Sequence, residues 1–278
     1  MTEKGLTDAV IGRMQAASDP RLRQLMEALV RHLHDFARET RLTPEEWLQA
    51  IRFLTATGQT CDDKRQEFIL LSDTLGLSML VDALNNRREG VETPSTVLGP
   101  FYVEGAPDLP MGSDISAATE GGEKTLVSGR VLDGQGRPIA GAVLDVWQTA
   151  PNGLYDVQDA AAPELNLRGR FRTGADGAYH FRTVKPVSYP VPTDGPVGRL
   201  LLALGRHPYR PAHLHFIVSA PGMEALTTHI FVRGDEYLQS DAVFGVKDAL
   251  IVDFTRDEAA GEMRARYDFV MRKETGAA

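Results

Sequence analysis

The sequence predicts an α+β protein with a helical N-terminal region over residues 1–95 and a mixed β-sandwich over residues 96–278. Apolar residues recur at helical spacing through much of the first region, which favours amphipathic helices. Short strand-like runs alternate with turn signals from Lys124 onward, the rhythm of a β-sandwich. The 278 residues are 42% hydrophobic, which is enough for a packed core.

The first helix is expected over residues 18–40. Ser18 or Asp19 can cap its N-terminus, and Pro20 suits the first turn because its fixed φ is helical and it needs no N–H partner there. Apolar residues of this segment recur every three or four positions, at Leu22, Leu25, Met26, Leu29, Leu33 and Phe36. They would form one apolar face on a helix of about five turns.

Two more helical segments follow in the N-terminal region. Thr43, followed by a proline and two glutamates, is typical of a helix start, and we expect this helix to stop at Gly58. A third segment over residues 62–84 is expected to break at Gly76 and to continue as a short helix. The apolar faces of these helices need a partner.

The second region is expected to contain short strands. The turn-like sequences GQGRP and ADG separate runs with β-branched and aromatic residues. The predicted strands cover residues 125–133, 142–150, 170–173, 179–184, 213–218 and 226–232. A short helix is expected within residues 195–205.

Composition excludes several classes of partner and site. The net charge is −8, from 30 basic and 38 acidic residues, and no long run of like charge occurs, so nucleic acid is not an expected partner. No apolar run approaches the roughly 20 residues of a membrane helix, and the first residues lack an apolar signal segment. We therefore expect a cytoplasmic protein. Because Cys61 is the only cysteine, a metal would have to be held by oxygen and imidazole nitrogen.

The most informative segment is RPAHLHF, which contains His213 and His215. Residues two apart on a strand point to the same face, with Cα atoms roughly 6.5–7 Å apart, so both imidazoles can reach one ion. Two such histidines are more often a surface or hydrogen-bonded pair. Tyr155 and Tyr189, taken singly, are also more often packed tyrosines with a bonded hydroxyl.

Together these four residues resemble the pattern of the intradiol ring-cleavage dioxygenases, in which two tyrosines and two histidines bind ferric iron. Phenolate oxygen and imidazole nitrogen are chemically suited to that ion. The resemblance extends over essentially the whole chain through several separate motifs: LGPFY at 98–102, SGRVLD at 128–133, GRPIAGAVLDVWQ at 136–148, GLY at 153–155, YPVPTDGPVG at 189–198 and RHPYRPAHLHF at 206–216.

The resemblance implies one non-haem Fe(III) per subunit, with Tyr155, Tyr189, His213 and His215 as its ligands. It implies an aromatic 1,2-diol and O₂ as substrates, with Tyr189 leaving the metal to act as a base. Arg210 would supply a fixed positive charge, although an arginine at this position can also be a surface or salt-bridging residue. A homodimer joined through the helical region is also implied, with a lipid held there in some members.

Within this family the sequence most resembles the hydroxyquinol 1,2-dioxygenases, which convert benzene-1,2,4-triol to maleylacetate in aromatic catabolism. The stretches that indicate this include NLRGRFRT and GDEYLQSDAVFGVKD. Asp73 could accept a hydrogen bond from the third hydroxyl, or it could simply lie at a helix end. His229 would be close to the metal ligands. The remaining substrate-pocket residues implied by the motifs are Leu70, Val97, Leu98, Gly99, Pro100, Phe101, Val191, Pro192 and Val243.

Three alternatives stay open at this point. A catechol or chlorocatechol 1,2-dioxygenase that forms cis,cis-muconates would share the same metal ligands. A non-catalytic transthyretin-like binding module would explain SGRVLD and GRPIAGAVLDVW but would leave the two tyrosines and two histidines without a role. A zinc hydrolase built on the two histidines lacks a third ligand with a matching motif.

Overall fold

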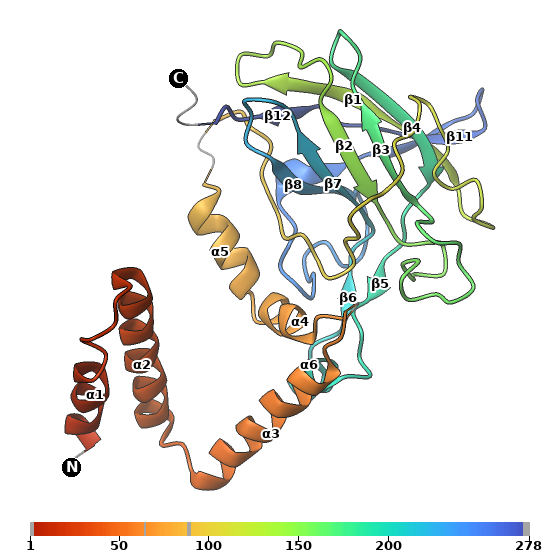
Figure 1. Cartoon of the computed structure of the whole chain (residues 1–278). Coiled ribbons are helices and arrows are strands. Elements are labelled where there is room, and N and C mark those ends of the chain that lie inside the picture. Colours follow the sequence, from red (N-terminus) through yellow and green to blue (C-terminus); the bar gives the residue numbers. More distant parts are fainter. Residues whose placement is uncertain (1–2, 64, 88–89, 275–278) are drawn as a thin grey trace. The chain divides into compact units, whose positions relative to one another are not determined.

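The computed structural model describes residues 3–63, 65–87 and 90–274. It divides into two compact units, Met1–Ala56 and Thr57–Ala278, which are described separately below. The predicted boundary at residues 95 and 96 falls inside the second unit, and the predicted domain ends at residues 1 and 278 lie outside the described residues. The predicted α+β class is confirmed, because the described chain combines mainly N-terminal helices with mixed sheets (Figure 1).

The first unit contains α1 (Glu3–Gly12), α2 (Pro20–Thr40) and most of α3 (Pro44–Thr60). The sequence prediction missed α1. Asp19 is the N-cap of α2, where its carboxylate accepts hydrogen bonds from the backbone N–H groups of Arg21 and Leu22 at 2.8 and 3.1 Å. The predicted start of the helix is therefore confirmed.

The start of α3 is a capping box. The Glu46 carboxylate accepts from the Thr43 N–H at 2.9 Å, and the Thr43 hydroxyl accepts from the Glu46 N–H at 3.3 Å. The helix continues to Thr60, so the predicted stop at Gly58 is wrong by two residues. The apolar faces of α2 and α3 are substantially exposed at Leu22, Leu25, Leu29, Leu33, Phe36, Trp47, Ile51 and Leu54.

The second unit begins with α4 (Glu67–Thr74) and α5 (Leu77–Asn85). Gly76 separates them with φ 75°, a left-handed conformation that glycine adopts without steric cost, so the predicted break is confirmed. The predicted short helix is also present as α6 (Pro196–Ala203). The buried Glu67 accepts a hydrogen bond from the Val197 N–H at 3.1 Å and so connects α4 to the first turn of α6.

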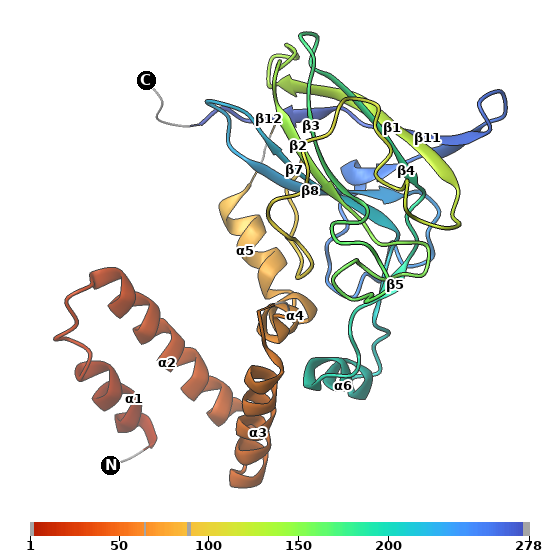
Figure 2. The same cartoon turned by 45° about the vertical axis from the view of Figure 1, so that its right-hand side comes forward.

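Two five-stranded sheets form the framework of the second unit (Figures 1 and 2). The first sheet contains β10 (Phe254–Asp257), β11 (Glu262–Arg266), β1 (Lys124–Asp133) and β12 (Phe269–Met271), with β4 (Ala178–Val184) also paired to β1. The second has the order β3 (Arg168–Arg172), β2 (Val143–Trp147), β7 (His213–Ser219), β8 (Leu226–Val232), β9 (Ile251–Val252). A separate pair joins β5 (Tyr189–Pro190) and β6 (Tyr209–Arg210).

The sheets are mixed, because β1 pairs in parallel with β11 and β12 while it pairs antiparallel with β4. The sequence prediction covered the six longer strands from β1 to β8 but missed the two-residue strands β5 and β6 and all of β9 to β12. In β11, buried Met263 and Ala265 alternate with Arg264 and Arg266, so a period of two was present. These strands are short and charged, and their alternation is a weak signal on its own.

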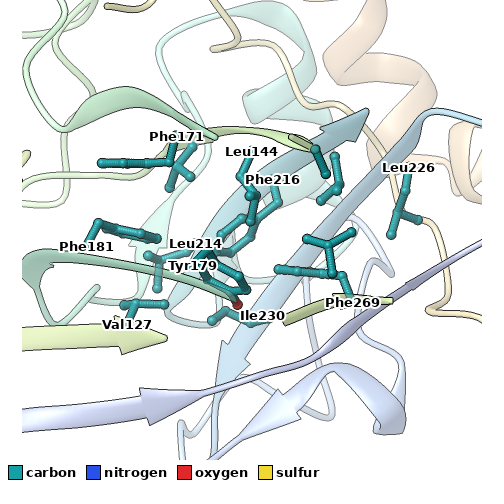
Figure 3. Packing of buried hydrophobic residues seen from close by; sticks show 14 of the residues in the cluster. Val127, Leu144, Phe171, Tyr179, Phe181, Leu214, Phe216, Leu226, Ile230 and Phe269 are labelled. Carbon is teal, nitrogen blue, oxygen red and sulfur yellow. The ribbon is translucent and has the colours of Figure 1, made fainter. Parts of the chain in front are cut away.

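The core lies between the two sheets (Figure 3). On β7, the core face carries Leu214, Phe216 and Val218. Since side chains alternate along a strand, His213 and His215 point to the other face of the same strand. Packing of the core therefore fixes the direction in which both histidines project. Within the described ranges, no helix has the length and apolar character needed to cross a bilayer.

Candidate metal centre

Strand pairing brings a third histidine to the predicted pair. Antiparallel register places His215 of β7 beside His229 of β8 and also beside Trp147 of β2. Cross-strand partners share a face of the sheet, so these side chains gather on the face opposite the core. All three imidazoles are buried, and ligand atoms of His213, His215 and His229 lie within 4.8 Å of one another.

Tyr155 and Tyr189 reach the same point from outside this sheet. Tyr155 follows β2 in a loop, and Tyr189 lies on β5. The Tyr155 hydroxyl is 2.9 Å from His215 Nε2 and 3.3 Å from the Tyr189 hydroxyl. His213 Nε2 is in turn 3.1 Å from His215 Nε2. The four residues selected from the sequence are therefore brought together, although they come from positions up to 60 residues apart.

These distances fit atoms that share a metal ion. Metal–ligand bonds of about 2.0–2.1 Å place neighbouring ligand atoms roughly 3 Å apart. His213 Nδ1 is 2.6 Å from the Pro211 carbonyl oxygen, so Nδ1 carries the proton and Nε2 presents its lone pair to the cluster. Two imidazole nitrogens and two phenol oxygens thus form a donor set that can hold a hard cation.

Burial controls the protonation of this cluster. It holds the pKa of His213, His215 and His229 well below the ordinary value, and the charged Arg210 lowers all three further. Burial also raises the pKa of Tyr155 and Tyr189. The imidazoles are therefore neutral and available as ligands, while ionisation of the two phenols needs a nearby positive charge.

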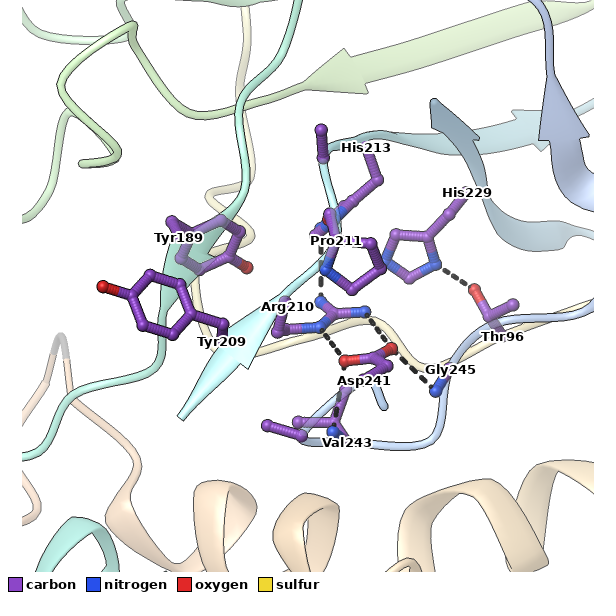
Figure 4. Close-up of polar contacts among 12 residues, drawn as sticks. Thr96, Tyr189, Tyr209, Arg210, Pro211, His213, His229, Asp241, Val243 and Gly245 are labelled. Carbon is purple, nitrogen blue, oxygen red and sulfur yellow. Dashed lines mark hydrogen bonds and ion pairs between the residues drawn. The ribbon is translucent and has the colours of Figure 1, made fainter. Parts of the chain in front are cut away.

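Arg210 lies beside the histidines and is itself buried (Figure 4). Its Nη1 is 3.2 Å from His213 Nε2, while its Nε donates to Asp241 at 3.1 Å. Burial opposes the charged form, but Asp241 and the two tyrosine hydroxyls raise the pKa of Arg210 above its usual value. Asp241 also accepts from the N–H groups of Val243 and Gly245 at 3.2 and 2.9 Å. The guanidinium is therefore a fixed charge beside the cluster.

A cavity of about 560 Å³ lies next to this cluster. It is lined by five of the predicted pocket residues, Leu70, Pro100, Phe101, Val191 and Pro192. Phe101 stacks on the Tyr155 ring with centroids 4.6 Å apart, which connects the cavity wall to the candidate ligands. The volume is in the range typical of small-molecule sites.

Comparison with known proteins identifies the family. The family described as "Dioxygenase" matches residues 97–273, and "Catechol dioxygenase N terminus" matches residues 19–93. The chain belongs to the intradiol dioxygenases. It is 55% identical to 6-chlorohydroxyquinol 1,2-dioxygenase of Cupriavidus pinatubonensis, with 97% of each chain covered. It is also 55% identical to hydroxyquinol 1,2-dioxygenase of Rhizobium sp., over 93% of this chain and 88% of that protein.

A solved structure agrees with this assignment. Hydroxyquinol 1,2-dioxygenase from Pseudomonas putida DLL-E4 superposes with a TM-score of 0.91 at 53% identity, covering 98% of this chain and 99% of the other. The chain is therefore an enzyme, and the reading as a non-catalytic binding module is wrong. Both family matches together account for the helical region and the sandwich of this intradiol dioxygenase.

The other predicted pocket residues of the dioxygenase do not line that cavity. Asp73 is buried on α4, where Arg210 and Asp241 influence its charge. Val97 and Val243 are buried, whereas Leu98 is 42% exposed. Gly99 has φ +77°, and a Cβ at this position would lie 3.2 Å from the His215 ring, so glycine permits close approach there.

The sequence indicated no role for several residues that pack around the candidate ligands. Trp147 stacks on His215 with centroids 4.5 Å apart and an interplanar angle of 13°. Arg168 makes a buried ion pair with Asp156, next to Tyr155, and donates to the Phe101 carbonyl at 2.8 Å. In the strand register, Trp147 pairs with Arg168 on one side and with His215 on the other. This cross-strand alignment cannot be seen in the sequence.

Proposed function

We propose that this intradiol dioxygenase cleaves hydroxyquinol, benzene-1,2,4-triol, with O₂ at a non-haem Fe(III) centre, giving maleylacetate. The observation that carries the proposal is the convergence of two phenol oxygens and two imidazole nitrogens at separations of 2.9–3.3 Å. Both atoms of O₂ enter the product, so the reaction needs no further oxidant or reductant. It is a step in the catabolism of aromatic compounds.

Tyr155, Tyr189, His213 and His215 would hold one iron per subunit. Two phenolates and one hydroxide balance the charge of Fe(III), and neutral imidazoles add none, so the buried site is left without excess charge. When bound, ferric iron supplies Lewis acidity at the diol oxygens and an electronic route between the ring and O₂. The cavity beside the ligands leaves room for a single aromatic ring.

The side chains around the ligands carry the proton and charge steps. Tyr189 Oη takes a proton from the bound diol, because a phenolate in a buried site is a strong base. Arg210 Nη1 lies beside the cluster, 3.2 Å from His213 Nε2, and stabilises negative charge that develops on the reacting ring and oxygen atoms. Asp241 keeps the guanidinium in that position through its bond to Nε. Arg210 and Tyr189 are therefore the proposed catalytic residues.

The triol is favoured over catechol for two reasons. The relatives reported above include enzymes named for hydroxyquinol and for 6-chlorohydroxyquinol. Asp73 does not line the cavity, but it is a buried carboxylate in the field of Arg210. The third hydroxyl of a ring bound beside Arg210 would give it a hydrogen-bond partner. Catechol offers no such group, so the carboxylate would stay without that partner. The other proposed substrate-binding residues are Leu70, Val97, Leu98, Gly99, Pro100, Phe101, Val191, Pro192, His229 and Val243.

We also propose that residues 96–278 act as the catalytic domain and residues 1–95 as a dimerisation region of a cytoplasmic homodimer. The exposed apolar side chains of α2 support this, since none of its residues is buried. A lipid at that interface would cover the same apolar surface. Analytical ultracentrifugation, followed by solvent extraction and mass spectrometry, tests both points.

Metal analysis and product analysis together test the function. The purified protein should contain one iron per subunit and show a visible phenolate-to-iron(III) charge-transfer band. It should consume one O₂ per benzene-1,2,4-triol and release maleylacetate. Metal-free protein that fails to bind Fe(III) with this band would contradict the metal proposal. Faster turnover of catechol to cis,cis-muconate would instead support the catechol 1,2-dioxygenase alternative.

A further inference from the structure

His229, proposed above as a substrate-binding residue, has the environment of a metal ligand although it is not one of the four proposed ligands of iron(III). The residue is 0% exposed, and its ring centroid lies 4.1 Å from that of His215 and 4.8 Å from that of His213. Its Nδ1 makes a short hydrogen bond with the Thr96 hydroxyl (Figure 4). Its Nε2 is buried and has no hydrogen-bond partner among the residues that the structure describes.

This arrangement leaves a question that the four-ligand site does not answer. A buried polar atom without a partner costs about 1–3 kcal/mol, so its retention calls for a reason. Metal-binding histidines have one ring nitrogen anchored by a neighbouring group and the other directed at the ion. Thr96 anchors His229 in this way, as the Pro211 carbonyl anchors His213.

The three imidazoles form a donor set that differs in kind from the proposed ferric set. Three neutral nitrogens suit a divalent ion such as Zn²⁺ or Co²⁺, and three-histidine sites are known for such ions. The two tyrosine oxygens suit a harder, more highly charged ion. The largest separation among ligand atoms of the three histidines is 4.8 Å, so a shared ion requires the rings to draw together by about 1 Å from their present positions.

We propose that His213, His215 and His229 form a second, divalent mode of this metal centre, in which a cation is held by three imidazoles without the tyrosines. The three-histidine mode is inferred from the geometry of the histidines. Only its contrast with iron(III) binding rests on the proposed function. A divalent cation in this mode would occupy two ligands that iron(III) also needs. His229 would then make the enzyme open to competition from zinc.

A crossed metal-binding experiment tests the two modes separately. Metal-free full-length protein is titrated with Co²⁺ alone, with affinity from competition against a chromogenic chelator and coordination from the visible Co²⁺ spectrum. We expect His229→Gln to weaken Co²⁺ binding by at least about 10–100-fold, and Tyr155→Phe to change it by less than about threefold. With Fe(III), the order should reverse. His229→Gln should keep the charge-transfer band, and Tyr155→Phe should lose iron.

Two further variants make the result interpretable. His180→Gln removes an exposed histidine from β4 and should leave both titrations unchanged. Thr96→Val removes the anchor of His229 and should weaken Co²⁺ binding by about tenfold while ferric binding is retained, even if His229→Gln fails to fold.

Two outcomes would overturn the divalent mode: unchanged Co²⁺ affinity in both His229→Gln and Thr96→Val, or an equal loss in Tyr155→Phe. Wild-type protein that binds Fe(III) without a charge-transfer band would instead count against the proposed function. The Co²⁺ titrations would still stand in that case, so the two failures can be told apart.

Discussion

The two sides of the candidate site are built in different ways. One side, from β6, β7 and the loop at residues 241–245, is a chain of polar contacts in which Asp241 holds Arg210 and Arg210 contacts His213. The other is the cavity wall, formed by Leu70, Pro100, Phe101, Val191 and Pro192, which acts through shape and apolar surface. We infer that the two sides have different roles. The polar side acts in the chemical step, and the cavity wall selects the substrate.

This comparison leads to predictions that differ in kind as well as in size. Loss of a ligand should remove the metal, and loss of a fixed charge should lower turnover with the metal still bound. A change in the cavity wall should alter the choice of substrate. A variant of the polar side that changed only the substrate preference would contradict this assignment of roles to the two sides.

The largest effect is expected from the ligands. Tyr155→Phe and His215→Ala each remove one of four donors and leave the remaining site under-coordinated. We predict less than about a tenth of the wild-type iron content, with loss of the visible band and of activity. Elemental analysis and absorption spectra measure this. His180→Ala, an exposed histidine outside the cluster, is the matched control and should retain full iron.

The second largest effect is expected at Arg210. Arg210→Ala should keep iron and the visible band while kcat/KM falls by about 10²–10³-fold, the scale for one preorganised charged group. Arg210→Lys should recover part of this loss, because it restores the charge without the geometry of the Asp241 contact. Steady-state kinetics with iron-normalised enzyme measures both. Unchanged kinetics in Arg210→Ala would reduce this residue to a structural ion pair.

Periodicity predicts that the two histidines share a face, whereas Tyr155, Tyr189 and Arg210 were assigned to the site only through the family resemblance. The two-residue spacing of His213 and His215 dictates that they share a face, and the core residues that alternate with them on the strand dictate which face. Asp19, Gly76 and Pro196 mark helix boundaries through local backbone chemistry. The shared face of the histidines and the helix boundaries depend on residues that are close together in the chain. They can therefore be predicted from the sequence alone.

The parts that could not be predicted depend on register and on long-range pairing. Trp147 and His229 flank His215 because three strands align at one residue each, and no local pattern encodes this alignment. Only the family resemblance placed His229 near the ligands, and nothing in the sequence placed Trp147 there. Asp241 reaches Arg210 across 31 residues of sequence. The parallel pairing of β1 with β11 and β12 likewise joins segments more than 130 residues apart. A prediction that looks for strands joined by short turns cannot find such pairs.

Asp73 offers a way to sharpen the comparison of the two sides. It belongs to α4, as does Leu70 of the cavity wall, yet its carboxylate lies in the field of Arg210. We predict that Asp73→Leu keeps the iron spectrum and lowers the ratio of kcat/KM for triol over catechol by about tenfold, since the hydrogen-bond acceptor is lost. Competition assays with both substrates measure the ratio. A full preference in the variant would move its cause away from Asp73.

The smallest effect is expected on stability. It distinguishes the destabilisation caused by burying the Asp73 carboxylate from the proposed role of that carboxylate in substrate selection. Burial raises the pKa of Asp73 above its ordinary value, although a hydrogen bond from Ser78 and the charge of Arg210 oppose the shift. A raised pKa means that the folded state binds this proton more tightly than the unfolded state does. The free energy of unfolding therefore falls as pH rises from the unfolded pKa to the folded pKa, and the loss is constant above it.

Asp73→Asn removes this loss while it keeps an oxygen that accepts from Ser78. We predict that the variant is more stable than the wild type at pH 7 by about 1 kcal/mol, or about 2–4 °C in Tm, and that the difference disappears near pH 4. Thermal unfolding of the two proteins at both pH values measures this. A variant that is less stable at pH 7 would mean that the Arg210 attraction outweighs burial. Asp73 would then stabilise the polar side of the site, and this structural role would explain the buried carboxylate without a hydrogen bond to the substrate.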